Sequence, residues 1–385
     1  MTYLDHNATT PVRPEVVDAM LPWLREGYGN PSSVYALGQR ARAAVEKARE
    51  QVACLIGASD PSEIVFTSCG SESDVLAISG GAWQVHDESK GRRRKVVTSR
   101  IEHDAVRLLG SQLRRRGFEV AEAGCGRDGV VRGSELAALV DDQVAVVSLM
   151  HANNETGVLQ PVVEAVAAAR AHGALVHTDA VQSLGKVAFD VKALDVDLLA
   201  ISGHKINAPK GVGALFVRRG VRLSPLVTGH QEKNRRGGTE NVALIVGLGL
   251  ACEFAGREIS QAPAHALALR KRLEAGVLQI PGARLNGHPE SRLPNTAHFS
   301  FEGLDGRHLV VALDLEGICV SSGPACSSGA STPSHVLTAM EVPAPLATGS
   351  IRVSVGWGSA DDDVDRFLEV LPKAVARLRA VAAPA

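Results

Sequence analysis

One lysine of this chain stands where its amine could do chemistry. Residues 198–201 form an apolar run, and Lys205 follows it among small residues, with Ser202 and His204 just before it. A lysine held at the end of a strand, beside groups that bind phosphate, can form the Schiff base of a pyridoxal phosphate (PLP) enzyme. The plain alternative is a solvated loop lysine.

A carboxylate ends another apolar run, at residues 174–178. Asp179 follows this run directly, and Gln182 comes three residues later. In a PLP site such a carboxylate would keep the pyridine nitrogen protonated, which makes the ring an electron sink, and the glutamine amide would reach the phenolic oxygen. Asp179 also suits a helix cap, so both interpretations stay open.

A run of small polar residues, 68–74, lies between a predicted strand and a predicted helix. Backbone N–H groups at a helix N-terminus favour an anion, so Gly70 and Ser71 are candidate phosphate ligands. Ser202 and His204 could add a hydroxyl and an imidazole. An ordinary capping turn explains residues 68–74 equally well.

A histidine and an asparagine follow two further strands. His103 comes shortly after the run at residues 95–98, where an imidazole could stack on a ring and move protons near neutral pH. Asn154 lies in the polar segment 153–157, where an amide could orient a substrate without carrying charge. A structural histidine and a plain turn are the alternatives.

A cysteine and an arginine complete the candidate set. Cys326 lies among the small residues 321–330, which predict an exposed, mobile loop, and its nucleophilicity depends on its pKa. Arg352 lies on the apolar segment 350–354, where a guanidinium could grip a carboxylate with two hydrogen bonds. A structural ion pair would also explain this arginine.

The elements that must position these residues follow an α/β pattern. Short apolar runs alternate with helical segments, of which residues 161–171 are an example. This pattern predicts a mostly parallel sheet covered on both faces, with ligands bound beyond the carboxyl ends of the strands. The predicted strands are residues 63–67, 95–98, 144–149, 174–178, 198–201 and 213–217.

The pattern changes from about residue 240. Long helices are predicted at residues 241–257 and 265–278, and then come strands at 297–301, 318–320 and 350–354 and a helix from residue 361. These elements predict a smaller α+β domain. We therefore expect a large domain of residues 12–250, and a small domain of residues 1–11 and 251–385.

Composition describes an ordinary globular protein. The 385 residues are 45% hydrophobic and 22% charged, with a net charge of −1, so no nucleic-acid partner is expected. Neither a signal peptide nor a membrane-spanning run is evident, which predicts a cytoplasmic protein without a membrane partner. Six scattered cysteines predict reduced thiols and no intrinsic metal site.

Six segments, spread over nearly the whole chain, resemble the cysteine desulfurases of the NifS/IscS type. They are residues 3–10, 29–33, 102–103, 177–182, 202–205 and 238–241. The resemblance implies the class V aminotransferase family, the PLP-dependent fold type I and a homodimer. It also implies an enzyme that takes sulfur from L-cysteine, leaves L-alanine and passes a persulfide to an acceptor protein.

The resemblance also implies roles for single residues. The implied catalytic residues are Lys205, Cys326 and His103, and the implied substrate ligands are Asn154 and Arg352. Cofactor ligands would be Gly70, Ser71, His103, Asn154, Asp179, Gln182, Ser202, His204 and Lys205, with Thr239 reaching the phosphate of the other subunit. Cys326 could also contribute transiently to an iron–sulfur cluster shared with a scaffold protein.

The chain departs from the family pattern at a few places. Cys69 and Ser71 stand where glycine and threonine are common, and Pro324 stands where serine is frequent and would restrict the loop. The chain ends soon after its last predicted helix, which leaves the acceptor open between an iron–sulfur scaffold, a tRNA-thiolation relay and a nitrogenase pathway. An aminotransferase, a selenocysteine lyase and a non-enzymatic scaffold are the rival functions.

Overall fold

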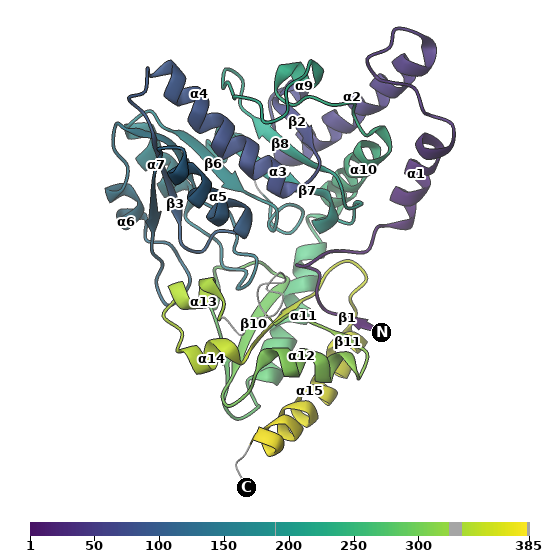
Figure 1. The fold of residues 1–385 in the computed structure, drawn as a ribbon. Helices are drawn as coiled ribbons and strands as arrows, with labels where there is room; N and C mark the ends of the chain where they lie inside the picture. The colour runs from purple at the N-terminus through teal and green to yellow at the C-terminus, as the bar shows by residue number, and fades with distance from the viewer. Residues whose placement is uncertain (189, 323–332, 383–385) are drawn as a thin grey trace.

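The computed structural model describes residues 1–188, 190–322 and 333–382. They form a larger lobe built around a sheet and a smaller lobe beneath it, with the N-terminus beside the junction of the two (Figure 1). A seven-stranded sheet forms the centre of the larger lobe. Its spatial order is β2 (Ile64–Thr67), β8 (Gly213–Val217), β7 (Leu198–Ser202), β6 (Leu175–Asp179), β5 (Val144–Ser148), β3 (Lys95–Ser99) and β4 (Glu119–Ala123).

The sheet is mostly parallel, as the sequence predicts. Strands β4, β3, β5, β6 and β7 run parallel to one another, and β8 runs antiparallel to both of its neighbours, β7 and β2. Six of the seven strands coincide with the predicted apolar runs. The α/β fold class is therefore confirmed.

The edge strand β4 was not among the predicted strands. Its residues are Glu-Val-Ala-Glu-Ala, and only the last of them is buried. Glu122 instead pairs with Arg114 on the neighbouring helix, at 2.7 Å. An edge strand that is half covered need not carry the continuous apolar run of a central strand, so its pattern was too weak to predict it.

Helices cover both faces of the sheet because successive side chains of a strand point to opposite faces. Val97 and Val147 pack with side chains of α2, α7 and α10, whereas Val96 and Val146 pack with side chains of α4 and α5. The helices of the larger lobe are α1 (Pro14–Arg25), α2 (Ala36–Ile56), α3 (Gly70–Val75), α4 (Gly81–Glu88), α5 (Asp104–Arg115), α6 (Gly133–Ala138), α7 (Val162–Ala171), α8 (Val191–Leu194), α9 (Gln231–Asn234) and α10 (Val242–Glu258).

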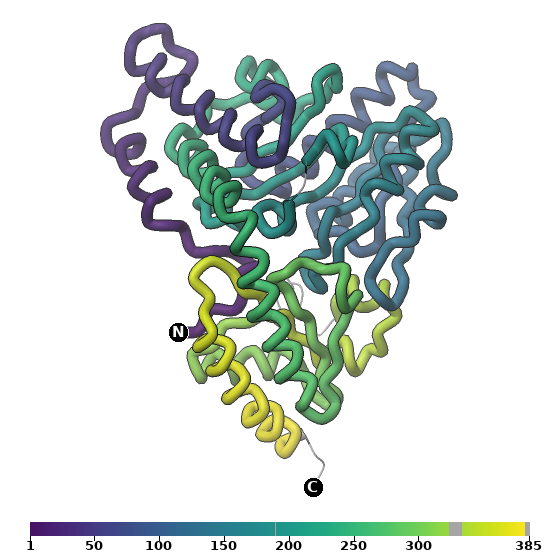
Figure 2. Tube along the Cα trace, turned by 180° about the vertical axis from the view of Figure 1, so that it is seen from behind, coloured from purple at the N-terminus to yellow at the C-terminus, as the bar shows by residue number. Residues whose placement is uncertain are grey.

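The smaller lobe combines short sheets with helices. One sheet has the order β12 (Ser350–Ser354), β10 (Thr296–Phe301) and β9 (Ala283–Leu285), and a second pairs β1 (Thr2–Tyr3) with β11 (Ile318–Cys319). Its helices are α11 (Ala262–Val277), α12 (Gly306–Asp314), α13 (His335–Ala339), α14 (Ala344–Thr348) and α15 (Asp361–Ala382). Seen from behind, α10 and α11 carry the chain from the larger lobe into the smaller one (Figure 2).

Two main hydrophobic cores accompany the two lobes. The core of the smaller lobe contains Leu4 together with side chains between Leu269 and Val375. The core of the larger lobe also takes in Val336 and Ala347, from α13 and α14. The domain limit expected at residue 250 falls inside α10. The domain limits stay a prediction. No helix of the described residues is long and apolar enough to cross a membrane.

Replacing Leu4 with alanine should destabilise the protein. Leu4 is fully buried in the core of the smaller lobe. The substitution leaves a cavity there, which costs about 2–5 kcal/mol of unfolding free energy. Urea denaturation followed by circular dichroism measures the loss, with exposed Val311→Ala on α12 as the control. An unchanged unfolding free energy for Leu4→Ala would contradict this packing.

Candidate active site

A cavity of about 250 Å³ opens at the carboxyl edge of the central sheet. Segments that follow β2, β3, β5, β6 and β7 line it, and the smaller lobe and the N-terminal segment close it. Ten residues singled out from the sequence meet in its wall: Gly70, Ser71, His103, Asn154, Asp179, Gln182, Ser202, His204, Lys205 and Arg352.

Two predicted site residues are not part of this wall. Thr239 is exposed, in the segment between α9 and α10, and does not line the cavity. Cys326 lies outside the described residues. The role expected for Thr239 requires a second subunit, so its position in one chain agrees with that expectation without testing it.

Lys205 is held by the N-terminal segment of the chain. It ends a single 3₁₀ turn, Gly203–Lys205, directly after β7. Its Nζ donates hydrogen bonds to the carbonyl oxygens of Asn7, at 2.5 Å, and Ala8, at 2.8 Å. These two acceptors restrain the amine in the cavity wall, so Lys205 is not the solvated loop lysine of the plain alternative.

Asp179 is a buried carboxyl group at the end of β6. One of its oxygens, Oδ1, accepts the N–H of Val181 at 2.8 Å. A turn and not a helix follows β6, so Asp179 is not the helix cap of the alternative. Burial, and next the nearby Asp74 carboxyl, raise the pKa of Asp179 to about 7. A cationic N–H donor in the cavity would hold this group ionised, and the pyridinium of PLP is such a donor.

A second buried carboxyl group, Asp74 on α3, was missed by the sequence analysis. Its Oδ1 lies 3.5 Å from His177 Nε2, and neither atom has a hydrogen-bond partner among the described residues. Burial raises the pKa of Asp74 to about 8 and lowers the pKa of His177 to about 4. Asp74 therefore favours its neutral form beside Asp179. Its position between Ser73 and Val75 resembled an ordinary helix start.

The turn before α3 has the features of a phosphate site. A Cβ atom at Gly70 would lie 2.8 Å from Val181 Cγ2 and 3.1 Å from Ser202 Cβ, so the close approach of the backbone requires glycine. The buried Ser202 Oγ has no hydrogen-bond partner among the described residues. An orphaned hydroxyl beside a helix N-terminus suits a phosphate oxygen, so the residues present fit PLP.

His204 and Cys69 lie in the same cavity wall as this turn. Burial and the positive charge of Lys205 lower the pKa of His204 to about 4, so its imidazole is neutral and contacts Thr9 Oγ1 at 3.2 Å. Cys69 caps α3, because its sulfur accepts the N–H of Glu72 at 3.4 Å. The capping alternative and the phosphate site are therefore both compatible with this turn.

His103 has one ring nitrogen engaged by the backbone. Its Nδ1 accepts the N–H of Ala105 at 3.1 Å, which makes it the N-cap of α5. In the neutral ring the proton then lies on Nε2. His103 is thus a structural cap that can also present an N–H donor to the cavity.

Arg352 takes part in the ion pair expected as its alternative. It donates from Nη2 to Asp5 Oδ1 at 2.7 Å and from Nη1 to the Asn154 carbonyl at 2.9 Å. Its Nε and the Asn154 side-chain oxygen are buried and have no partner among the described residues. Both residues line the cavity, so these atoms are candidates for contacts with a substrate.

Two further polar residues line the wall: Glu155, in the segment 153–157 for which a plain turn was the alternative, and His335 on α13. The buried Glu155 accepts a hydrogen bond from Ser334 Oγ at 2.5 Å, and burial raises the pKa of Glu155. His335 donates from Nε2 to the Glu102 carbonyl at 2.9 Å. These contacts join the cavity wall to α13.

The chain is similar to known proteins over nearly its whole length. The model of the aminotransferase class-V family matches residues 2–367. The chain is 46% identical over 378 residues to "Cysteine desulfurase IscS" of Methanosarcina thermophila, covering 98% of this chain and 92% of that protein. It is 45% identical over 381 residues to "Cysteine desulfurase NifS" of Azotobacter vinelandii, covering 98% and 94%.

Solved structures show the same fold. A structure described as a NifS-like protein superposes with a TM-score of 0.91 at 39% identity, covering 98% of this chain and all of that chain. A NifS-like protein from Rickettsia africae superposes with a TM-score of 0.86 at 31% identity, covering 98% and 99%.

Ser202→Ala should weaken the binding of PLP about ten-fold, because one hydrogen bond to a charged oxygen contributes about 1.5 kcal/mol. Equilibrium dialysis against PLP measures the affinity. Ser260→Ala, an exposed serine, is the control and should bind as the unchanged protein does. Equal affinity in Ser202→Ala would contradict a phosphate contact at Ser202.

Proposed function

Because this chain belongs to the class-V aminotransferase family and its relatives are cysteine desulfurases, we propose that it takes sulfur from L-cysteine, leaves L-alanine and carries the sulfur as a persulfide on Cys326. The enzymes of this family depend on PLP. The observation that carries the proposal is one cavity that gathers the Lys205 amine, the buried Asp179 carboxyl and the Arg352 guanidinium.

The cofactor would be held by residues of the larger lobe. Lys205 would bind it covalently, Asp179 would pair with the pyridine nitrogen, and His103 would stack on the ring. Gln182 would contact the phenolic oxygen, and Ser71, Ser202 and His204 would bind the phosphate. When bound, PLP supplies an electron sink that stabilises negative charge on the substrate Cα.

The substrate would be oriented by the smaller lobe. Asp5 and the Asn154 carbonyl engage one N–H each of Nη2 and Nη1, so Nε and the remaining N–H groups of Arg352 would be available to the carboxylate of L-cysteine. The partnerless side-chain oxygen of Asn154 would accept a hydrogen bond from the bound substrate or cofactor. These contacts would direct the thiol group of the substrate away from the Arg352 side of the cavity.

Protons would be moved by Lys205 and His103. The Lys205 amine would take the Cα proton of the substrate, while the carbonyl oxygens of Asn7 and Ala8 keep it at the wall. His103 presents Nε2, because its Nδ1 is engaged by the backbone, and would exchange protons with the sulfur groups.

Sulfur transfer would occur at Cys326. Its thiolate would attack the sulfur of L-cysteine, forming an S–S bond while the Cβ–S bond breaks. The electron pair of the broken bond stays with the carbon fragment, which takes up protons to become L-alanine. The sulfur atom is oxidised as the carbon is reduced, so no external oxidant is required.

Cys326→Ser should abolish sulfur transfer while PLP stays bound. Alanine and sulfide released from L-cysteine in the presence of a thiol reductant should fall at least 100-fold, and the absorption of the bound cofactor should be unchanged. Cys54→Ser, an exposed cysteine distant in sequence, is the matched control. Full turnover in Cys326→Ser would refute this nucleophile, and a need for a keto acid would indicate transamination.

We also propose that the protein is a homodimer. The connection between α1 and α2 exposes large apolar side chains, with Tyr28 82% and Val34 86% accessible in the single chain. Large apolar side chains that are exposed along one connection in this way are typical of an interface. Thr239, exposed here, would then complete the phosphate site of the partner subunit.

The double variant Tyr28→Asp/Val34→Asp should sediment as a monomer, whereas the unchanged protein should sediment as a dimer. Two buried carboxylates would be too costly in an apolar interface. The variant should also retain less PLP, since the Thr239 contact is lost. Val311→Asp, on the exposed face of α12, is the control. A monomeric unchanged protein would end the proposal.

The persulfide would pass to an acceptor protein, for which we propose an iron–sulfur cluster scaffold in the cytoplasm. The five cysteines of the described residues are all free thiols, as a reducing compartment would keep them.

A further inference from the structure

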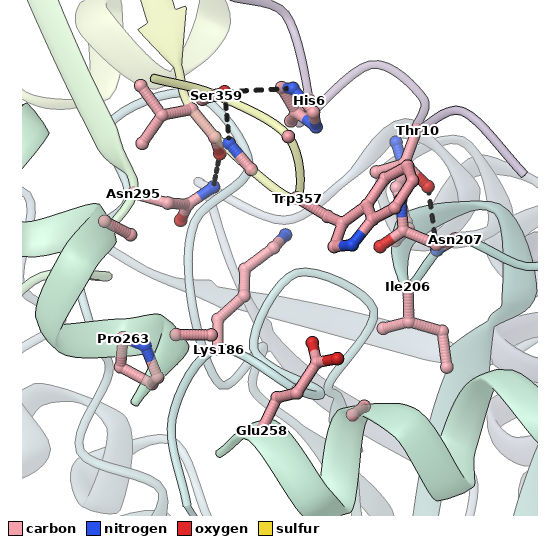
Figure 3. A pocket seen from close by; sticks show the side chains of 18 of the residues that line it. His6, Thr10, Lys186, Ile206, Asn207, Glu258, Pro263, Asn295, Trp357 and Ser359 are labelled. Atoms are coloured by element: carbon pink, nitrogen blue, oxygen red, sulfur yellow. Dashed lines mark hydrogen bonds between the residues drawn. The ribbon is translucent and has the colours of Figure 1, made fainter. Parts of the chain in front are cut away.

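A second cavity of about 240 Å³ lies on the other side of Lys205. Its wall is formed by the N-terminal segment, the junction of α10 and α11, and the loop around Trp357. Lys205 borders both this second cavity and the active site. The proposed reaction gives the second cavity no role. Figure 3 shows Lys186 reaching into it among Asn295, Trp357 and Glu258.

The wall of this second cavity includes the amine of Lys186, which no carboxylate balances in the described part of the chain. Lys186 Nζ donates to Gln182 Oε1 at 3.2 Å and forms no ion pair with a carboxylate of the described residues. Glu258 does not compensate it, because Arg13 binds both of its carboxylate oxygens. Burial and the charge of Lys186 lower the pKa of His6 to about 4, so His6 is neutral.

Burial and the neighbouring charges of Lys205 and Arg352 lower the pKa of Lys186 to about 7. An anion beside Nζ would favour the ammonium form and so raise the pKa of Lys186 again. The remaining wall is largely apolar and includes Ala251, Ala255, Pro263 and Trp357. The occupant therefore needs one negative charge and a compact apolar body.

We propose that this cavity binds a small carboxylate anion, with its carboxylate on Lys186 and its apolar part against α10 and α11. Cavities of about 150 Å³ hold a benzene molecule, so about 240 Å³ accommodates an acid of six to nine non-hydrogen atoms.

An anion bound in the second cavity would change the hydrogen bonds of Gln182, which lines the active site. Its Oε1 accepts from Lys186, and its Nε2 donates to the Asn7 carbonyl at 3.1 Å, the oxygen that also accepts from Lys205. A carboxylate that takes over Lys186 frees Gln182 Oε1 and alters the contacts of the cofactor. This effect on the cofactor rests on the proposed function, whereas binding of the anion does not.

Butyrate, titrated into the PLP-loaded protein and followed by calorimetry, tests the proposal, with butyramide as its neutral match. Butyrate should bind at least about ten-fold more tightly than butyramide, because the contact with Lys186 is a charge-assisted hydrogen bond. Lys186→Met should remove this preference. Lys271→Met, an exposed lysine on α11, should leave it unchanged.

Two further variants locate the bound anion. Ala255→Leu narrows the cavity and leaves Lys186 in place, so it should also abolish butyrate binding. If Lys186→Met does not fold, Ala255→Leu serves as the test of the site. Arg352→Gln should keep butyrate binding. Loss of binding in Arg352→Gln with retention in Lys186→Met would assign the anion to the substrate subsite and overturn the proposal, as would undiminished binding in Ala255→Leu.

The absorption of the bound cofactor separates this proposal from the proposed function. Butyrate should shift that absorption in the unchanged protein but not in Lys186→Met. If desulfurase activity is absent while Lys186-dependent binding remains, only the proposed function fails. If activity is present and butyrate binds no better than butyramide, only the second site fails.

Discussion

The active site depends on a short N-terminal segment that ties the two lobes together. Leu4 is buried in the core of the smaller lobe, and Asp5 holds Arg352 of β12. The carbonyl of Asn7 accepts from both Lys205 and Gln182 of the larger lobe, and its side-chain amide donates to Thr296 of β10, at 2.9 Å. The spacing between the Lys205 amine and the Arg352 guanidinium is therefore set by this one stretch of backbone.

Several of the buried polar atoms without partners among the described residues belong to the wall of the candidate active site. Ser202 Oγ, Arg352 Nε and Asp74 Oδ1 are all buried without a hydrogen bond among the described residues. Each such group costs about 1–3 kcal/mol of stability, so a folded chain keeps few of them without a use. Their gathering in one wall is expected if ligand atoms complete their hydrogen bonds. In the same way, an anion would balance the amine of Lys186, which forms no ion pair with a carboxylate of the described residues.

Structural and functional interpretations of the site residues turned out to be compatible. Asp179 forms a turn with Val181, His103 caps α5, and Arg352 forms an ion pair. Each contact engages only some of the polar atoms of the side chain. The structural contact orients the residue, and the remaining atoms are left for a ligand in the cavity that these residues line.

The sequence by itself determined the central strands, the fold class and most of the residues proposed for the active site, ten of which line one cavity. Those features depend on local patterns: continuous apolar runs, residue types at strand ends and segments shared with a family. Only the tertiary structure decided the Asp5–Arg352 pair, the buried Asp74 and the cavity at Lys186. These contacts join positions up to 347 residues apart, and local patterns do not report how the fold brings distant residues together.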